Sequence, residues 1–353
     1  MGDKTKIQWT DATWNPLRGC ARVSDGCRNC YAESVAHRFG GPGMPYEGLT
    51  RIVNSHPTWT GEVRMIPELL DQPLRWKRPR RIFVNSMSDL FHEKVPDHFI
   101  DRVFGAMWAC HVCAGGQSKH VFQILTKRAK RMRDYLRQNR REHWARAAIN
   151  LAGKYDPDGI FDDIANAQGS HPRVWLGVSV ENQATADERI PLLLDTPAAV
   201  RWISAEPLLG EINLYPSSYL PCQNYEHVIM DPETGGFECC SQCDYTGISE
   251  EIGIDWIVAG GESGPHARPT HPEWLRSLRD QCKAAGVRFF FKQWGEWIPG
   301  SQTSDTGNQT ALVGACQHGH RWENGAHSWR IGKKAAGRLL DGVLHDEYPE
   351  DKA

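Results

Sequence analysis

Residues 174–206 read VWLGVSVENQATADERIPLLLDTPAAVRWISAE, and their pattern of apolar residues indicates the fold class. Two short apolar runs, Val174–Val180 and Val200–Ser204, flank the amphipathic run Thr185–Leu194. A strand, a helix and a second strand within about 30 residues are typical of a parallel sheet with helical crossovers. The stretch is therefore predicted to be one βα unit followed by the strand of the next.

The same alternation recurs along the chain. Further strands are predicted at Thr13–Leu17, Ile82–Asn85, Val121–Leu125, Asp255–Ala259 and Val287–Phe291. Helices are predicted at Asp97–Trp108, Arg128–Ile149 and Pro272–Ala285. The last of these helices begins with proline and ends before Gly286, which are ordinary start and stop signals. The predicted fold class is α/β, a complete or partial (β/α) barrel of about six to seven βα units with a small cysteine-rich insertion.

Polar side chains follow most of the predicted strands. They are Ser86, Ser88, Asp89, Lys127, Ser179, Glu181, Asn182 and Glu206. In a barrel these strand ends converge on the face where barrel enzymes keep their chemistry. The alternative is that they serve as turn residues or as salt bridges to Arg128, Arg189 or Arg268.

The composition is that of an ordinary folded protein. The chain has 353 residues, of which 40% are apolar and 24% are charged. No stretch of about 20 residues is free of charge, and the N-terminus lacks the apolar core of a secretory signal. We therefore expect a cytoplasmic protein that does not enter a membrane. Eleven cysteines, an odd number, point to metal ligation or buried thiols rather than to disulfides.

Three regions are predicted from the spacing of these patterns. The barrel comprises residues 1–214 and 253–299, and a cysteine-rich, metal-binding insertion occupies residues 215–252. Residues 300–353 form a C-terminal loop and extension, in which Gly300–His327 is rich in glycine and polar residues and is predicted to be a surface loop.

Cys20, Cys27 and Cys30 form a C-x6-C-x2-C cluster directly after the first predicted strand. Structural zinc sites and ordinary iron–sulfur sites are closed by four ligands, so three cysteines leave one metal position open for a substrate or cofactor. The alternatives are a Cys3His zinc site completed by His37 or His92, and unligated buried thiols.

A second cysteine cluster lies in the insertion. Its members are Cys222, Cys239, Cys240 and Cys243, and the last two have zinc-knuckle spacing. A structural zinc, held by these four or with His227 among the ligands, is the favoured interpretation. An auxiliary iron–sulfur cluster is the alternative.

Two basic segments interrupt an otherwise nearly neutral chain. The first is Arg75–Arg81, and the second is Lys127–Arg146, where Asp134 and Glu142 are the acidic residues. Such a positive face could follow a phosphate backbone, with Trp76, Tyr135 or Trp144 available for stacking. The alternative is a solvated helix with long basic side chains lying along it.

Eight segments of the chain resemble a known family. They are TWNPLRGCARVSDGCRNCYAE, RIFVNSMSDLF, FQILTKR, WLGVSVEN, RWISAEPLLG, DWIVAGGESG, FFFKQWGEW and GKKAAGRLLDG. Together they resemble the phage-associated three-Cys-motif proteins, an uncharacterised family that is radical S-adenosylmethionine (SAM)-like. The resemblance spans Ile7 to Gly342. It implies a [4Fe–4S] cluster on Cys20, Cys27 and Cys30, with SAM on the fourth iron.

The cysteine motif departs from the usual radical SAM pattern. Its first gap is six residues instead of three, and Asn29 stands where an aromatic residue usually precedes the third cysteine. No Gly-Gly-Glu follows the second strand, where Ser86, Ser88 and Asp89 could bond the SAM ammonium instead.

The resemblance also assigns roles to later strand ends. It implies ribose and carboxylate contacts for Ser179, Glu181 and Asn182, and Glu206 follows the next strand. Lys127 or Arg128 could pair with the SAM carboxylate or with a substrate phosphate.

The function that these patterns predict is a radical SAM enzyme. It would draw an electron from a donor, cleave SAM and abstract hydrogen from an unidentified substrate, with a nucleic acid or nucleotide favoured. The alternative is a non-catalytic, zinc-stabilised nucleic-acid-binding protein.

Overall fold

The computed structural model describes residues 5–113, 120–152, 157–214, 253–302 and 318–350, and the backbone of residues 229–230 and 237–238. These residues fall into two compact units. The first unit runs to Val178 and includes Asp195–Val200, and the second comprises Ser179–Leu194 and the chain from Arg201 onward.

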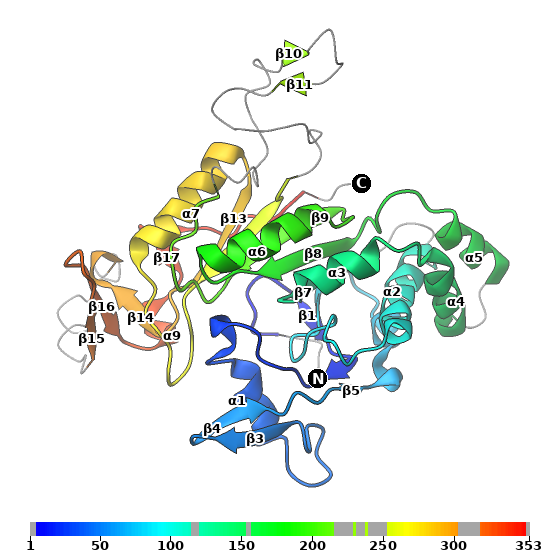
Figure 1. The fold of residues 1–353 in the computed structure, drawn as a ribbon, viewed down its shortest axis with the longest axis horizontal. Coiled ribbons are helices and arrows are strands. Elements are labelled where there is room, and N and C mark those ends of the chain that lie inside the picture. Colours follow the sequence, from blue (N-terminus) through cyan, green and yellow to red (C-terminus); the bar gives the residue numbers. More distant parts are fainter. Residues whose placement is uncertain are drawn as a thin grey trace. The chain divides into compact units, whose positions relative to one another are not determined.

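Four parallel strands form the sheet of the first unit (Figure 1). They are β1 (Ala12–Trp14), β6 (Arg80–Val84), β7 (His120–Thr126) and β8 (Val174–Ser179). Thr13 lies opposite Phe83, and Phe83 opposite Gln123. Nearly every residue of β7 and β8 is buried. Burial on both faces explains why these strands appear in the sequence as continuous apolar runs rather than alternating ones.

Three parallel strands form the sheet of the second unit. They are β9 (Val200–Ala205), β12 (Trp256–Gly260) and β13 (Arg288–Gln293). Trp202 and Trp256 are register partners whose rings lie 5.3 Å apart, and both are fully buried. These large side chains fill the core of this unit.

Helices connect the parallel strands. In the second unit, α6 spans Gln183–Leu194 and α7 spans Pro272–Ala285. The bounds predicted for α7 are confirmed, and Gly286 ends it in the left-handed region with φ of +66°. All seven predicted strands are present within a few residues, so the predicted α/β fold of parallel βα units, a partial (β/α) barrel, is confirmed.

The prediction of one helix at Arg128–Ile149 is wrong. The chain forms α3 (Ala129–Leu136) and α4 (Arg141–Ala152), with Arg140 between them. The Arg140 guanidinium donates to both carboxylate oxygens of Asp101, at 2.7 and 2.6 Å. Asp101 belongs to α2 (Asp97–Val112), so a contact between distant residues fixes the break.

The remaining elements are short. In the first unit they are α1 (Tyr31–Arg38), β2 (Leu17–Arg18), β3 (Thr50–Val53), β4 (His56–Trp59), β5 (Arg64–Met65), α5 (Pro157–Ala165), and the 3-10 turns η1 (Asp25–Cys27), η2 (Pro67–Leu69) and η3 (Gln72–Arg75). In the second they are β10 (Ile229–Met230), β11 (Phe237–Glu238), β14 (Trp297–Pro299), η5 (Gly300–Gln302), β15 (Gly319–Arg321), β16 (His327–Arg330), α9 (Lys333–Ala336), β17 (Leu339–Leu340) and β18 (Val343–Leu344).

Part of the predicted loop Gly300–His327 is regular structure. β15 lies inside it, and β16 begins at its last residue. Both strands pair antiparallel in the sheet β14-β16-β15. The prediction of a surface loop is therefore wrong for these residues. Within the described part of the chain, no helix combines the length and the apolar character that crossing a bilayer needs.

The buried His171 side chain should make the free energy of unfolding depend on pH. Burial, together with the neighbouring His111, lowers the pKa of His171 to about 3. The unfolded chain takes up this proton below about pH 6.5 and the folded chain does not, so stability falls as the pH drops from 6.5 towards 3. At pH 5 this residue should cost about 2 kcal/mol of unfolding free energy relative to pH 8.

Urea denaturation of the wild type and of His171→Gln at both pH values measures this contribution. The variant should lose about that much less stability on acidification. Equal losses in the two proteins would show that His171 does not carry the dependence.

Candidate functional site

The three cysteines of the first cluster lie on the loop that follows β1 and β2. Trp14, at the end of β1, is fully buried and donates its indole N–H to the Leu69 carbonyl at 2.7 Å, which anchors the strand end. Gly19 then bridges to Ser88, which follows β6. The loop therefore begins at the carboxyl ends of two neighbouring parallel strands.

Local turns bring the later cysteines back toward Cys20. Cys27 ends η1 and donates its N–H to the Ser24 carbonyl at 2.9 Å. Cys30 occupies the N-cap position of α1 and donates its N–H to the Cys27 carbonyl at 3.3 Å. Cys20 and Cys30 pack against one apolar cluster, whose buried members are Ala32, Ala36, Tyr46, Leu49, Trp59 and Met87.

The three thiols lie within electrostatic reach of one another. Burial raises the pKa of Cys20 to about 12, and negative charge on Asp89, Cys30 and Cys27 adds to the shift. Burial also raises the pKa of Cys30, with a contribution from Cys27. A metal cation beside the sulfurs would reverse this balance, because it stabilises thiolates.

The donor set fits an iron–sulfur cluster in its chemistry. All three cysteines are free thiols. Across the residues that the structure describes, no group of three or more Cys, His, Asp or Glu side chains is arranged to hold a single metal ion. Each thiolate of a [4Fe–4S] cube binds a different iron, and three cysteines leave the fourth iron open.

A buried ion pair connects the cysteine loop to the third strand of the first unit. Arg128 donates to Asp89 at 3.0 Å, and their side chains are only 6% and 8% exposed. The same guanidinium lies 4.0 Å from the Cys20 sulfur and donates to the Ala21 carbonyl at 3.4 Å. Arg128 is therefore the cation that faces the first thiol of the cluster.

Asp89 is fully engaged by the protein. Its carboxylate accepts from the Thr126 hydroxyl at 2.8 Å, the Lys127 N–H at 3.2 Å and the Phe91 N–H at 3.0 Å, besides Arg128. These bonds tie the loop after β6 to the end of β7. That Asp89 contacts SAM stays a prediction.

Two of the other predicted residues support the same loop. The Ser86 hydroxyl donates to the Asn15 side chain at 3.2 Å, and the Ser88 hydroxyl donates to the Leu17 carbonyl at 2.9 Å. The Tyr31 hydroxyl, from the start of α1, donates to the Ser86 carbonyl at 2.6 Å. The first unit thus gathers Ser86, Ser88, Asp89 and Lys127 at the strand ends that carry the cysteines.

A second ion pair beside the cysteines does not stand out in the sequence. Glu33 in α1 is buried, accepts two bonds from Arg22 at 2.9 and 2.6 Å, and accepts the Trp59 N–H at 3.0 Å. Arg22 lies between Cys20 and Cys27 in the chain. The Arg22–Glu33 pair therefore holds the six-residue segment between these two cysteines against α1. A glutamate at the third position of a helix gives no signal of burial by itself.

The other predicted strand-end residues belong to the second unit. Glu181 pairs with Arg189 at 3.3 Å with both side chains buried, and Glu206 pairs with Lys292 at 2.7 Å. Asn182 accepts the Thr185 N–H at 3.1 Å. The Ser179 carbonyl accepts from Arg189 at 2.7 Å. The salt-bridge alternative is found for Glu181, and contacts of these residues with SAM stay a prediction.

The second cysteine cluster lies outside the described residues. Cys222, Cys239, Cys240 and Cys243 therefore remain predicted ligands, with zinc or an auxiliary cluster as the predicted metal group.

Acidic partners neutralise much of the second basic segment. Besides Arg128 and Arg140, the paired residues are Lys130, Arg131, Arg133, Arg137 and Arg146, which contact Asp134, Asp97, Asp195 or Glu142. Several of these acids come from other parts of the chain, which the sequence pattern does not reveal. The segment is therefore less positive than its composition suggests.

Replacing Gly19 tests how closely the backbone of the cysteine loop packs against Glu62. Its φ is +88°, and a Cβ there would lie 2.2 Å from the Glu62 carbonyl oxygen. Gly19→Ala should lower the unfolding free energy by about 2–3 kcal/mol, since a backbone clash adds to the strain of positive φ.

Gly48→Ala is the matched control, because Gly48 also has a positive φ of +75° but has open space where the Cβ would point. Urea denaturation should give a loss of about 1 kcal/mol for this variant. Equal losses of unfolding free energy in the two variants would show that the close approach of the Glu62 carbonyl adds nothing to the cost of a Cβ at Gly19.

Comparisons with known proteins place the chain in a family but assign no activity. A comparison with curated proteins gave no match. Solved structures similar to the chain include spore photoproduct lyase complexed with dinucleoside spore photoproduct, with 8% identity and a TM-score of 0.34; the match covers 94% of this chain and 71% of that chain. A variant of the lyase with bound AdoMet and dinucleoside spore photoproduct has 9% identity and a TM-score of 0.35, with the same coverage. TM-scores this low assign neither a fold nor an activity.

A family model matches nearly the whole sequence, over residues 4–349. Its description names no reaction, so phage association and radical SAM chemistry stay predictions. The chain belongs to the family described as Protein of unknown function (DUF5131).

Proposed function

We propose that this protein is a radical SAM-type enzyme whose cluster is held by Cys20, Cys27 and Cys30. The observation that carries the proposal is the position of three free thiols on one loop, directly after the first parallel strand of the sheet. Three cysteine ligands leave one iron of a [4Fe–4S] cube open. Bound there, the reduced cluster would supply the electron that cleaves SAM and so generates a radical able to abstract hydrogen from a substrate.

The chain's own residues would prepare this site in three ways. Arg128 places positive charge 4.0 Å from Cys20 and so favours its thiolate. Asp89 positions Arg128. The apolar residues packed against Cys20 and Cys30 limit the access of water to the sulfurs.

Eight residues at the ends of strands are the proposed SAM contacts. Ser86, Ser88, Asp89 and Lys127 lie after the strands β6 and β7 and are proposed to bind the methionine part of SAM. Ser179, Glu181 and Asn182 are proposed for the ribose and carboxylate, and Glu206 is proposed as a further contact of the cofactor. A nucleic acid or nucleotide is the proposed substrate class, and an external electron donor is required.

Product analysis tests the proposal. Protein reconstituted anaerobically with iron and sulfide, then given SAM and dithionite, should form 5′-deoxyadenosine and methionine. A brown, sulfide-containing protein that leaves SAM intact would show a retained cluster without SAM chemistry. Zinc without acid-labile sulfide would favour the zinc-stabilised, non-catalytic alternative.

The proposed contact of Lys127 with SAM can be tested by its effect on SAM affinity. If its ammonium pairs with the SAM carboxylate, Lys127→Ala should weaken SAM binding about tenfold to a hundredfold, the cost of losing a charged partner in a partly buried site. Equilibrium titration of SAM into the reconstituted protein measures this. Lys130→Ala is the control, since that side chain is 75% exposed and pairs with Asp134. Affinities within about twofold for both variants would remove Lys127 from the site.

A further inference from the structure

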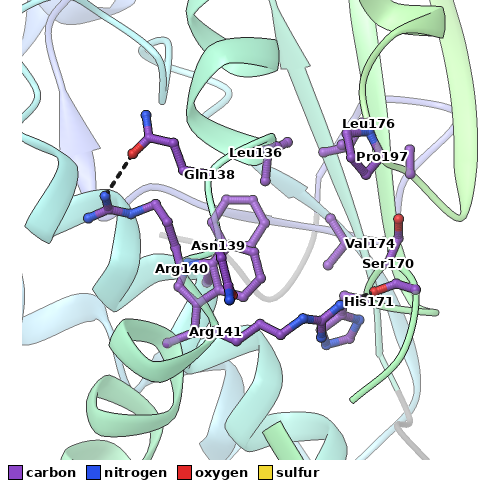
Figure 2. Close-up of a pocket in the computed structure, with 14 residues that line it drawn as sticks. Leu136, Gln138, Asn139, Arg140, Arg141, Ser170, His171, Val174, Leu176 and Pro197 are labelled. Carbon is purple, nitrogen blue, oxygen red and sulfur yellow. Dashed lines mark hydrogen bonds between the residues drawn. The ribbon is translucent and has the colours of Figure 1, made fainter. Parts of the chain in front are cut away.

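A cavity lies in the first unit, away from the cysteine loop. Its volume is about 250 Å³, and it is lined by the start of α4, the residues before β8 and the first half of β8 (Figure 2). Val174, the first residue of β8, belongs to its wall. The cysteines follow the carboxyl end of β1, which is parallel to β6, β7 and β8. The cavity therefore lies at the opposite ends of the strands.

One part of the wall is aromatic. Phe104 of α2 and Trp144 of α4 stack there, with ring centroids 5.0 Å apart and an angle of 17° between the ring planes. The Trp144 indole N–H already donates to Tyr135 at 2.9 Å. Leu136, Val174, Leu176 and Pro197 make up most of the apolar wall. Flat aromatic and aliphatic surfaces of this kind favour a planar, apolar ligand.

The polar side of the cavity is cationic. Its lining contains Arg140, Arg141 and His171 but neither aspartate nor glutamate. Asp101, which does not line the cavity, accepts two hydrogen bonds from Arg140 and neutralises its charge. His171 stays uncharged at neutral pH because burial lowers its pKa to about 3.

Arg141 is the cation left to meet a ligand. Figure 2 shows its side chain extending from α4 toward His171. One terminal nitrogen donates to the Gly169 carbonyl. The other, Nη1, is buried and makes no hydrogen bond to any described residue, and none of the described carboxylates pairs with this guanidinium. A buried charged donor without a partner is costly, and a ligand that brings an acceptor removes this cost.

We propose that this cavity binds a small aromatic carboxylate, with its ring against the Phe104–Trp144 wall and its carboxylate on Arg141. One unneutralised guanidinium matches a monoanion, whereas a phosphate monoester carries about −1.5 to −2 charges at neutral pH. The volume lies below that of pockets for drug-sized ligands, so one ring or two fused rings fit. The proposal is independent of the cysteine cluster and of SAM.

Three probes test the chemistry of the cavity, with binding followed by calorimetry on the full chain. The probes are 2-naphthoate, the neutral 2-naphthalenemethanol and inorganic phosphate. The naphthoate should bind saturably, and the alcohol at least about tenfold more weakly because it lacks the charge that Arg141 pairs with. Phosphate should not compete with the naphthoate at equal concentration. Equal affinity for the first two probes, no binding of either, or tighter binding of phosphate would each overturn the proposal.

Two variants and a control assign the binding to this cavity. Arg141→Gln should weaken naphthoate binding at least about tenfold and leave the alcohol unchanged. Arg146→Gln, on the same helix but 69% exposed, should change neither. Because Arg141 also holds the Gly169 carbonyl, Ala198→Phe serves as the second variant: it keeps Arg141, fills the cavity, and should abolish binding of both aromatic probes. Undiminished naphthoate binding in Ala198→Phe would place the binding elsewhere and overturn the proposal.

Discussion

Single replacement of Cys20, Cys27 or Cys30 with alanine is expected to remove most of the iron and sulfide that the protein takes up on anaerobic reconstitution. Each cysteine would hold a different iron of the cube, so no remaining thiol can replace a missing one. Iron and acid-labile sulfide per chain should each fall by most of the content of one [4Fe–4S] cube, which is about four atoms of each, in every variant.

Cys113→Ala is the control for this experiment. Cys113 is also a partly exposed free thiol of the first unit, at the C-terminal end of α2, but it is not on the cysteine loop. Its replacement should leave iron and sulfide unchanged. If all three loop variants kept full cluster content, the proposed ligand set would be refuted.

Asp89→Asn is expected to lower the free energy of unfolding by about 3–5 kcal/mol. The substitution keeps the size of the side chain but leaves the buried Arg128 guanidinium without its full counter-charge. Glu93 also accepts from Arg128 at 2.8 Å, but it is 65% exposed and compensates less because water screens it. Urea denaturation of the apo protein measures the loss.

An exposed ion pair of the same unit is the control for Asp89. Arg137 and Asp195 lie 2.6 Å apart, with side chains 57% and 44% exposed. Asp195→Asn should cost less than about 1 kcal/mol. Similar losses of unfolding free energy in the two variants would show that burial does not increase the contribution of the Asp89–Arg128 pair to stability.

The sequence predicts the parallel strands and α7 because their signals are local. Strands buried on both faces are continuous apolar runs, as in Val174–Val180. α7 has both its signals, Pro272 at the start and Gly286 after the end, next to the helix itself.

The features that the sequence does not predict depend on distant contacts. Arg140 separates α3 from α4 because it pairs with Asp101, 39 residues away in the chain. Arg128 meets Asp89 across the same separation. The strands β15 and β16 have few buried residues, so they carry little of the alternation that marks a strand.

The three cysteines themselves are evident from their spacing, whereas the charges that surround them are not. The sequence gives the number of basic residues near Lys127. It does not show which of them pair with acidic residues. Only the fold shows that Arg128 faces a thiol while Arg137 faces Asp195.

The ion pairs around the cysteine loop bear on the order of events in maturation. Arg22–Glu33, Arg128–Asp89 and the Gly19–Ser88 bridge hold the loop through contacts between protein groups. In a zinc finger, by contrast, the metal supplies the folding free energy. The proposed cluster could then be inserted into a chain that has already folded. A cluster destroyed by oxygen could be replaced in the same molecule, without passage through an unfolded state.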